Sequence, residues 1–221
     1  MAALKKINVM ESVYKRNEKY AAEFNARLTD KRVYCVNVMG SPGAGKTTLL
    51  LDLAKRLAKP VFVIEGDVAS DIDARTFAAA GVQAAQINTG SACHLNAADV
   101  VRKFDETAAG FTDGFLFIEN IGNLICPADF LLGEHVRVLV CAVTDGGDKP
   151  YKYPMAFEKA GAVLLNKTDL LKYVNFNIDF FTAGLRRINA TAPLFSVSGA
   201  TGEGLDAVAE WLTHVAGPVF A

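Results

Sequence analysis

The chain has 221 residues and a formal net charge of −1, so no overall charge attracts nucleic acid or an acidic membrane surface. Hydrophobic residues make up 51% and charged residues 21%, which excludes intrinsic disorder as the main state. The apolar runs, such as 138–143, are far shorter than the ~18 residues that span a bilayer, and residues 1–6 are not followed by the apolar stretch of a secretory signal.

The N-terminal segment places apolar residues at helical spacing among charges, which predicts an amphipathic helix over residues 9–29, packed on the outside of the fold. We expect this helix to form an extension of residues 1–32, followed by one domain over residues 33–221. In that domain, short apolar runs alternate with helical patterns. The expected strands are Tyr34–Met39, Val61–Glu65, Gln83–Ile87, Phe115–Glu119, Val136–Val143, Ala162–Leu165 and Leu194–Val197. The expected helices are Lys46–Leu57, Ile72–Ala80, Ala97–Lys103, Pro154–Ala160, Ile178–Ile188 and Leu205–Val215. This alternation predicts an α/β fold of three layers, with a mostly parallel central sheet and helices on both faces.

The first expected strand leads into a complete GxxxxGK[ST] motif, which runs from Gly40 to Thr47 and opens a helix. In such a P-loop the backbone N–H groups and the helix N-terminus bind phosphates, so the fold is expected to be that of the P-loop NTPases. Lys46 is expected to neutralise the β- and γ-phosphates, and the hydroxyl of Thr47 to bind Mg²⁺. The expected nucleotide-binding residues of this loop are Gly43, Ala44, Gly45, Lys46, Thr47 and Thr48.

Guanine recognition is suggested by the NKxD sequence of Asn166, Lys167 and Asp169, at the end of an expected strand. A carboxylate accepts hydrogen bonds from N1–H and the 2-amino group of guanine, whereas adenine has neither donor, so the site favours GTP and GDP over adenine nucleotides. Ser198, Gly199 and Ala200 are expected to form a backbone loop on the other side of the base.

Acidic side chains follow two of the expected strands. Asp67 and Glu119 lie where the carboxyl ends of parallel strands face a ligand, so we expect them to assist catalysis and to hold Mg²⁺ with Thr47. For Asp71 and Asp73, a functional role and a role as helix N-caps are equally compatible with the sequence.

Cysteine and histidine side chains form a second group. Cys93 and His94 are adjacent, and Cys126 follows the expected strand that ends in Glu119. Thiolates and imidazole suit Zn²⁺, Ni²⁺ or Cu, but on spacing alone such a cysteine is more often a small buried hydrophobe than a metal ligand. Four cysteines without a CxxC pair are typical of a protein of the reducing cytoplasm. Cys35 and Cys141 are expected in the core, and His135 and His214 in structural or surface roles.

Seven strings of the chain together resemble the HypB family, the GTPases that deliver nickel during maturation of nickel–iron hydrogenases. They are GSPGAGKTTLL, IEGD, GSACHLNA, FIENIGNLICPADF, GDKPYKYP, LNKTDL and SGATGEG. The resemblance implies a GTPase that dimerises when GTP is bound, with a Ni²⁺ or Zn²⁺ site at the dimer interface. By position it makes Cys93, His94 and Cys126 the metal ligands. It also implies other hydrogenase maturation proteins and the hydrogenase large subunit as partners, and it involves neither nucleic acid nor a membrane.

The sequence departs from the family pattern in two places. Residues 1–32 contain neither the cysteine motif nor the histidine-rich store with which many members begin. Ala98 stands where several members carry a further histidine, so water or the partner chain is expected to complete the metal coordination.

Two other functions remain compatible with these residues. One is a GTP-dependent regulatory switch or scaffold in which the Cys/His group is a purely structural zinc site. The other is a phosphotransferase kinase, for which Asn166–Asp169 would be incidental. Nucleotide preference separates the kinase from the others, and metal affinity compared between nucleotide states separates the first two.

Overall fold

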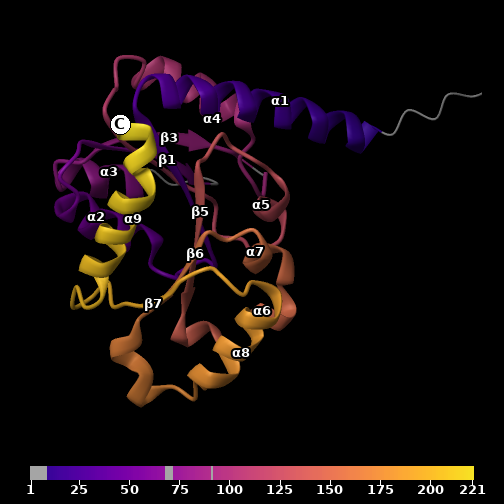
Figure 1. Ribbon diagram of the computed structural model, residues 1–221, viewed down its shortest axis with the longest axis vertical. Coiled ribbons are helices and arrows are strands. Elements are labelled where there is room, and N and C mark those ends of the chain that lie inside the picture. The colour runs from indigo at the N-terminus through magenta and orange to yellow at the C-terminus, as the bar shows by residue number, and fades with distance from the viewer. Residues whose placement is uncertain (1–8, 68–71, 91) are drawn as a thin grey trace, which may run out of the picture.

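The computed structural model describes residues 9–67, 72–90 and 92–221, which form one seven-stranded sheet covered by helices (Figure 1). The strands lie in the order β3-β2-β4-β1-β5-β6-β7, and each neighbouring pair is parallel. Their bounds are β1 Val33–Gly40, β2 Val61–Asp67, β3 Gln83–Asn88, β4 Gly114–Glu119, β5 Val136–Ala142, β6 Ala162–Asn166 and β7 Leu194–Ser196. The predicted α/β fold with a parallel central sheet is confirmed.

The helices connect these strands and cover both faces of the sheet. They are α1 Val9–Asp30, α2 Lys46–Arg56, α3 Ile72–Ala79, α4 Ala97–Thr107, α5 Cys126–Asp129, α6 Lys149–Lys152, α7 Pro154–Glu158, α8 Ile178–Ile188 and α9 Leu205–Phe220. Two 3₁₀ turns, η1 Val143–Asp145 and η2 Thr168–Tyr173, follow β5 and β6. Within the described part of the chain, no helix combines the length and the apolar character needed to cross a membrane.

The alternation of side chains along β1 explains why the sheet is covered on both faces. Val36 and Val38 pack into a cluster with residues of α2 and α9, whereas Val33 and Cys35 pack into a second cluster with residues of α1 and α4. Successive residues of a strand point to opposite faces, so a central strand that is buried throughout requires a helical layer on each side. Figure 1 shows α2 and α9 together on one face and α1 beside α4 on the other.

The N-terminal helix packs on the outside of the sheet, as its spacing predicts. Phe24 and Leu28 of α1 are buried in the cluster that includes Phe104 of α4. A third cluster lies between β5 and β6 and the helices α7 and α8. Cys35 and Cys141 are buried in the core, as expected.

The two histidines outside the Cys/His group have the expected roles. His135 accepts a hydrogen bond at Nδ1 from the N–H of Cys35 at 2.9 Å, and its Nε2 lies 2.9 Å from Oγ1 of Thr29. Its ring also stacks on that of Tyr34. His135 is therefore a structural residue, and His214 is exposed on α9.

Several helix limits differ from those expected. Predicted helix 97–103 continues to Thr107, predicted helix 205–215 continues to Phe220, and predicted helix 154–160 ends at Glu158. Pro218 lies in the last turn of α9, where the missing N–H removes one of the final hydrogen bonds of the helix. The helices α5 and α6 were not expected, because their four residues are too few to show a helical period.

Candidate functional site

The P-loop joins β1 to α2 with a backbone that requires glycine. Gly43 and Gly45 have φ angles of 72° and 94°, in the region that favours glycine. A Cβ atom on Gly45 would lie 2.4 Å from Nδ2 of Asn166. The loop is therefore tightly curved and closely packed against the end of β6.

Lys46 lies at the first position of α2 and lines a cavity of ≈ 700 Å³ together with Thr47, Thr48 and Lys167. Its side chain is 8% exposed, and its ammonium group donates to the carbonyl oxygen of Ser41 at 3.3 Å. Burial lowers the pKa of Lys46, although nearby carboxylates, with Glu119 foremost, act in the opposite direction. The cavity therefore presents one buried cation beside the glycine-rich loop.

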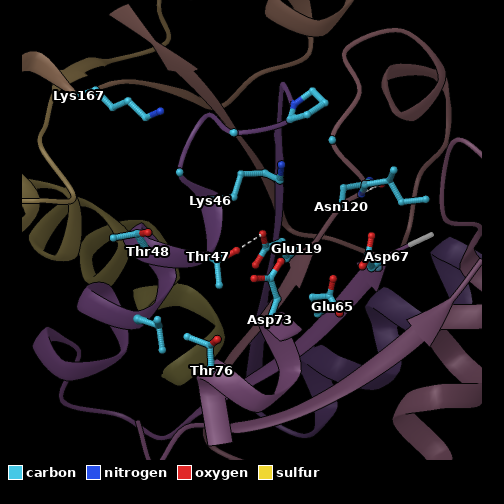
Figure 2. Close-up of a pocket in the computed structure, with 17 residues that line it drawn as sticks. Lys46, Thr47, Thr48, Glu65, Asp67, Asp73, Thr76, Glu119, Asn120 and Lys167 are labelled. Carbon is cyan, nitrogen blue, oxygen red and sulfur yellow. Dashed lines mark hydrogen bonds between the residues drawn. The ribbon is translucent and has the colours of Figure 1, made fainter. Parts of the chain in front are cut away.

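Among the described residues, four carboxylates line the same cavity as Lys46, and Figure 2 labels their side chains. They belong to Glu65 and Asp67 of β2, Asp73 of α3 and Glu119 of β4. Oγ1 of Thr47 donates to Oε1 of Glu119 at 2.8 Å, so two of the three residues expected to hold Mg²⁺ are already in contact.

Glu65 and Glu119 are register partners on β2 and β4, and both are buried. Burial raises the pKa of Glu119 to about 7. Burial also raises the pKa of Glu65 to about 8, with repulsion by Glu119 as the next cause. Among the described residues, Oε2 of each carboxylate has no hydrogen-bond partner. Buried oxygen atoms of this kind suit a hard cation, so the site fits Mg²⁺.

Sequence reasoning did not single out Glu65. The available signal was its position two residues before Asp67, which places both side chains on the same face of the strand. Asp73 is the second residue of α3 and lines the cavity, so it does not occupy the N-cap position. Asp71 lies outside the described residues.

The residues expected to recognise guanine connect three loops. Nδ2 of Asn166 donates to the carbonyl oxygen of Ala44 at 2.8 Å, and its Oδ1 accepts from the N–H of Gly199 at 3.0 Å. Oγ of Ser198 donates to Oδ1 of Asp169 at 2.6 Å. Asn166 therefore ties the loop after β7 to the P-loop. Ala200 follows in the same loop, and Lys167, with a φ of 62°, turns toward the cavity.

The structure brings Cys93, His94 and Cys126 together, with one possible ligand atom of each lying within 4.8 Å of the others. Cys93 is exposed, and its Sγ lies 3.6 Å from Nδ1 of His94. The pKa of Cys93 is raised, chiefly by its hydrogen bond with Cys126, and burial lowers the pKa of His94. The imidazole stacks on the ring of Phe130, with centroids 4.0 Å apart. This set of two sulfur atoms and one nitrogen suits Zn²⁺ or Ni²⁺.

A short segment runs from the nucleotide cavity to this group. Asn120, Ile121 and Gly122 line the cavity, and Cys126 begins α5. A Cβ atom on Gly122 would lie 2.9 Å from Cα of Pro42 in the P-loop. Residues 120–126 therefore pack directly on the P-loop at one end and supply a candidate metal ligand at the other.

The chain is similar to proteins of one family along most of its length. Residues 34–196 match the family described as CobW/HypB/UreG, nucleotide-binding domain. The hydrogenase maturation factor HypB of Azotobacter chroococcum mcd 1 is 44% identical over 95% of this chain and 68% of that relative. The HypB of Escherichia coli strain K12 is 41% identical over 96% of this chain and 73% of that relative.

Two solved structures have closely similar folds. The crystal structure of HypB from Helicobacter pylori in complex with nickel has a TM-score of 0.87 and 35% identity, covering 93% of this chain and 97% of that one. The structure of the hydrogenase maturation factor HypB from Archaeoglobus fulgidus has a TM-score of 0.84 and 32% identity, covering 91% and 99%.

Proposed function

Because this chain belongs to the HypB group of the CobW/HypB/UreG nucleotide-binding family, we propose that it is a GTP-hydrolysing metallochaperone that delivers nickel during maturation of nickel–iron hydrogenases. The observation that carries the proposal is the position of the Cys93, His94 and Cys126 group, one short segment away from a complete P-loop. The nickel complex of the Helicobacter pylori relative supports nickel as the cargo, and Zn²⁺ suits the same ligand atoms.

In the nucleotide site, the P-loop backbone and Lys46 bind the phosphates of GTP. Thr47 and Glu119, already hydrogen bonded, hold Mg²⁺ together with Asp67. When bound, the ion neutralises charge that develops on the phosphates during transfer. Lys46 stays beside those oxygens and stabilises the same charge. Asp169 selects guanine, and its contact with Ser198 fixes the carboxylate for that role.

In the metal site, Cys93 and Cys126 supply thiolates and His94 supplies a neutral imidazole. Three ligands leave a divalent transition metal incompletely coordinated, which suits a site that must release its cargo. We infer that water or a second copy of the chain completes the coordination. An isologous dimer places the same patch of both copies face to face, so the two exposed Cys93 residues can share one interface.

The two sites are coupled through residues 120–126. In P-loop GTPases the corresponding loop orders around the γ-phosphate and relaxes after hydrolysis. A metal ligand at its far end moves with it, so GTP aligns Cys126 with Cys93 and His94 and promotes the dimer. Partners in the reducing cytoplasm are the other maturation proteins and the hydrogenase large subunit.

The test compares metal affinity between nucleotide states. Ni²⁺ and Zn²⁺ are titrated into protein loaded with GDP or with a non-hydrolysable GTP analogue, while sedimentation reports the oligomeric state. We expect affinities that differ by roughly 5- to 150-fold, and metal must change nucleotide affinity by the same factor. Identical metal affinities and identical oligomeric states would instead favour a GTP-dependent switch with a purely structural zinc site.

A further inference from the structure

A chain of buried polar side chains runs from the end of β4 across β1 to β5. Nδ2 of Asn120 donates to Oδ1 of Asn37 at 3.2 Å, and Nδ2 of Asn37 lies 3.4 Å from Oε1 of Glu134. The same oxygen accepts from Nε of Arg137 at 2.5 Å. Asn37, Asn120 and Arg137 are 0%, 2% and 7% exposed. Asn37 and Arg137 lie on the otherwise apolar strands β1 and β5, and each side chain of this chain is hydrogen bonded to the next.

The guanidinium group of Arg137 is the last member of this series of hydrogen-bonded side chains. It contacts the segment that carries Cys126. Nη1 donates to the carbonyl oxygen of Ala128 at 2.7 Å, and Nη2 donates to that of Phe130 at 2.8 Å. Ala128 belongs to α5, the helix that Cys126 begins. The ring of Phe130 stacks on His94. One side chain therefore holds the backbone behind a proposed thiolate ligand and behind the ring that orients the proposed imidazole ligand.

The chemistry of this contact requires arginine. Its planar guanidinium presents five donors in a fixed fork, which here reach one carboxylate and two carbonyl groups at once. Lysine carries the same charge, but it is concentrated on one ammonium group that lacks this planar arrangement of donors. A buried ion pair is weak evidence for stability, because apolar residues of similar volume often stabilise as well or better. The role of Arg137 is therefore better explained by the backbone groups that it holds in place than by a contribution to stability.

We propose that Arg137 is a positioning residue for the metal centre, holding Cys126 and Phe130 in register with Cys93 and His94. Glu134 keeps the guanidinium in place: its Oε1 accepts from Arg137, and its Oε2 accepts from the N–H of Leu132 at 2.6 Å. The inference rests on the proposed function in one respect, that the metal is bound by Cys93, His94 and Cys126.

The experiment compares Arg137→Lys with two controls in the full chain. Nζ of Lys159, a partly exposed side chain, also donates to the carbonyl oxygen of Ala128, at 3.4 Å. The variant Lys159→Met removes this second donor. Leu212→Ala destabilises the core cluster on the α2 and α9 face, away from the metal site. Zn²⁺ affinity is measured by competition with a chromophoric chelator, the Ni²⁺ site by its thiolate-to-metal charge-transfer band, and the nucleotide site by GDP affinity.

We expect Arg137→Lys to weaken Zn²⁺ binding by roughly 10- to 100-fold and to shift the Ni²⁺ band, because partners that orient metal ligands have effects of this size. GDP affinity should stay within about 2-fold, and both controls should bind Zn²⁺ as the wild type does. If Arg137→Lys does not fold, Glu134→Gln serves instead, since it weakens the hold on the guanidinium and should change the band in the same direction.

Three outcomes overturn the proposal. The positioning role is excluded, and the metal site is left intact, if Arg137→Lys shows wild-type Zn²⁺ affinity and an unchanged Ni²⁺ band. The same result in Glu134→Gln has this meaning where that variant replaces Arg137→Lys. An equal loss of Zn²⁺ affinity in Leu212→Ala would show that loss of stability alone explains the effect. Failure of the wild type to bind either metal would overturn the proposed function, and this inference with it.

Discussion

Gly40, the residue at which β1 ends and the P-loop begins, pairs with Asn123 in an antiparallel β-bridge. The side chain of Asn123 extends the contact, since its Nδ2 donates to the carbonyl oxygen of Cys93 at 3.3 Å. Its Oδ1 accepts from the N–H of Ile125 at 2.9 Å, just before Cys126. One residue thus joins the start of the phosphate loop to the backbone of Cys93 and to that of Ile125, the residue before Cys126.

Replacement of Asn123 by alanine should reduce communication between the two sites. The variant keeps the backbone bridge to Gly40 but loses the amide contacts to Cys93 and Ile125. We expect the ratio of Ni²⁺ affinities between the GDP and GTP-analogue states to approach one, with GDP affinity itself nearly unchanged. Isothermal titration in both states measures the ratio. A ratio equal to that of the wild type would exclude Asn123 from the coupling.

Lys46→Ala should nearly abolish GTP hydrolysis. The charge on the β- and γ-phosphates then lacks its buried cation, and loss of one such group costs roughly 100- to 1000-fold in turnover. Phosphate release measures the rate, and Lys55→Ala, an exposed change near the other end of α2, is the matched control. Wild-type turnover by folded Lys46→Ala protein would place the active site elsewhere.

Asp169→Asn should weaken GTP binding and favour xanthosine triphosphate. The new amide donates to the 2-oxo group of xanthine, where the carboxylate only accepts. The amide oxygen still accepts from Ser198, so the loop should keep its shape. We expect a loss of at least ~100-fold for GTP in a competition assay with labelled nucleotides. Unchanged guanine preference would show that another residue reads the base.

A Cys93→Ser and Cys126→Ser double variant should lose most metal binding. Removal of both thiolates leaves His94 alone, whereas Cys35→Ala, a change in the core, should bind one metal per chain or per dimer as the wild type does. In the wild type, affinity should fall as the pH drops, because protons compete for sulfur and imidazole. Burial lowers the pKa of His94, whereas the pKa of Cys93 is raised. As the pH drops, protonation of the Cys93 thiolate should therefore weaken metal binding before protonation of His94 does. Equal metal uptake by the double variant would eliminate this site.

His135 should make the folded state sensitive to mild acid. Burial lowers the pKa of His135 below its ordinary value of 6.5, so the unfolded chain takes up a proton that the folded chain does not. Stability should therefore be complete above pH 6.5 and decline as the pH falls through that value toward the folded pKa. The slope is at most about 1.4 kcal/mol per pH unit. Urea unfolding between neutral and acid pH should give a flatter curve for His135→Gln than for the wild type or for His214→Gln. Parallel curves would mean that His135 titrates alike in both states.

Features built from consecutive residues could be predicted from the sequence. The P-loop and Asn166–Asp169 each lie within one strand–loop segment, and parallel strands place their carboxyl ends at a single edge. The convergence of Cys93 and Cys126 was implied by family resemblance rather than by spacing. Cys93 follows β3 and Cys126 follows β4, and the strand order places β2 alone between these two strands.

Features that depend on distant pairings could not be predicted. Glu65 lies near Glu119 because β2 and β4 are neighbours in a register that no local pattern encodes. Asn37 and Arg137 lie in apolar strands, where a lone polar residue gives no hint of its partner. Asn37 meets Asn120 and Glu134 across separations of 83 and 97 residues. Such contacts require the complete topology.

The strand order also has a consequence for synthesis on the ribosome. β1, β2, β3 and β4 pair among themselves, so four strands of the sheet can assemble once the chain has reached Glu119, and Cys126 follows soon after. Asn166 ends β6 and Ser198 follows β7, and these two strands are added at the far edge of the sheet. Because chains fold from the N-terminus as they are made, the phosphate loop and the three proposed metal ligands precede the residues proposed to recognise the base. We therefore expect discrimination between nucleotides to be the last of these properties that a nascent chain acquires.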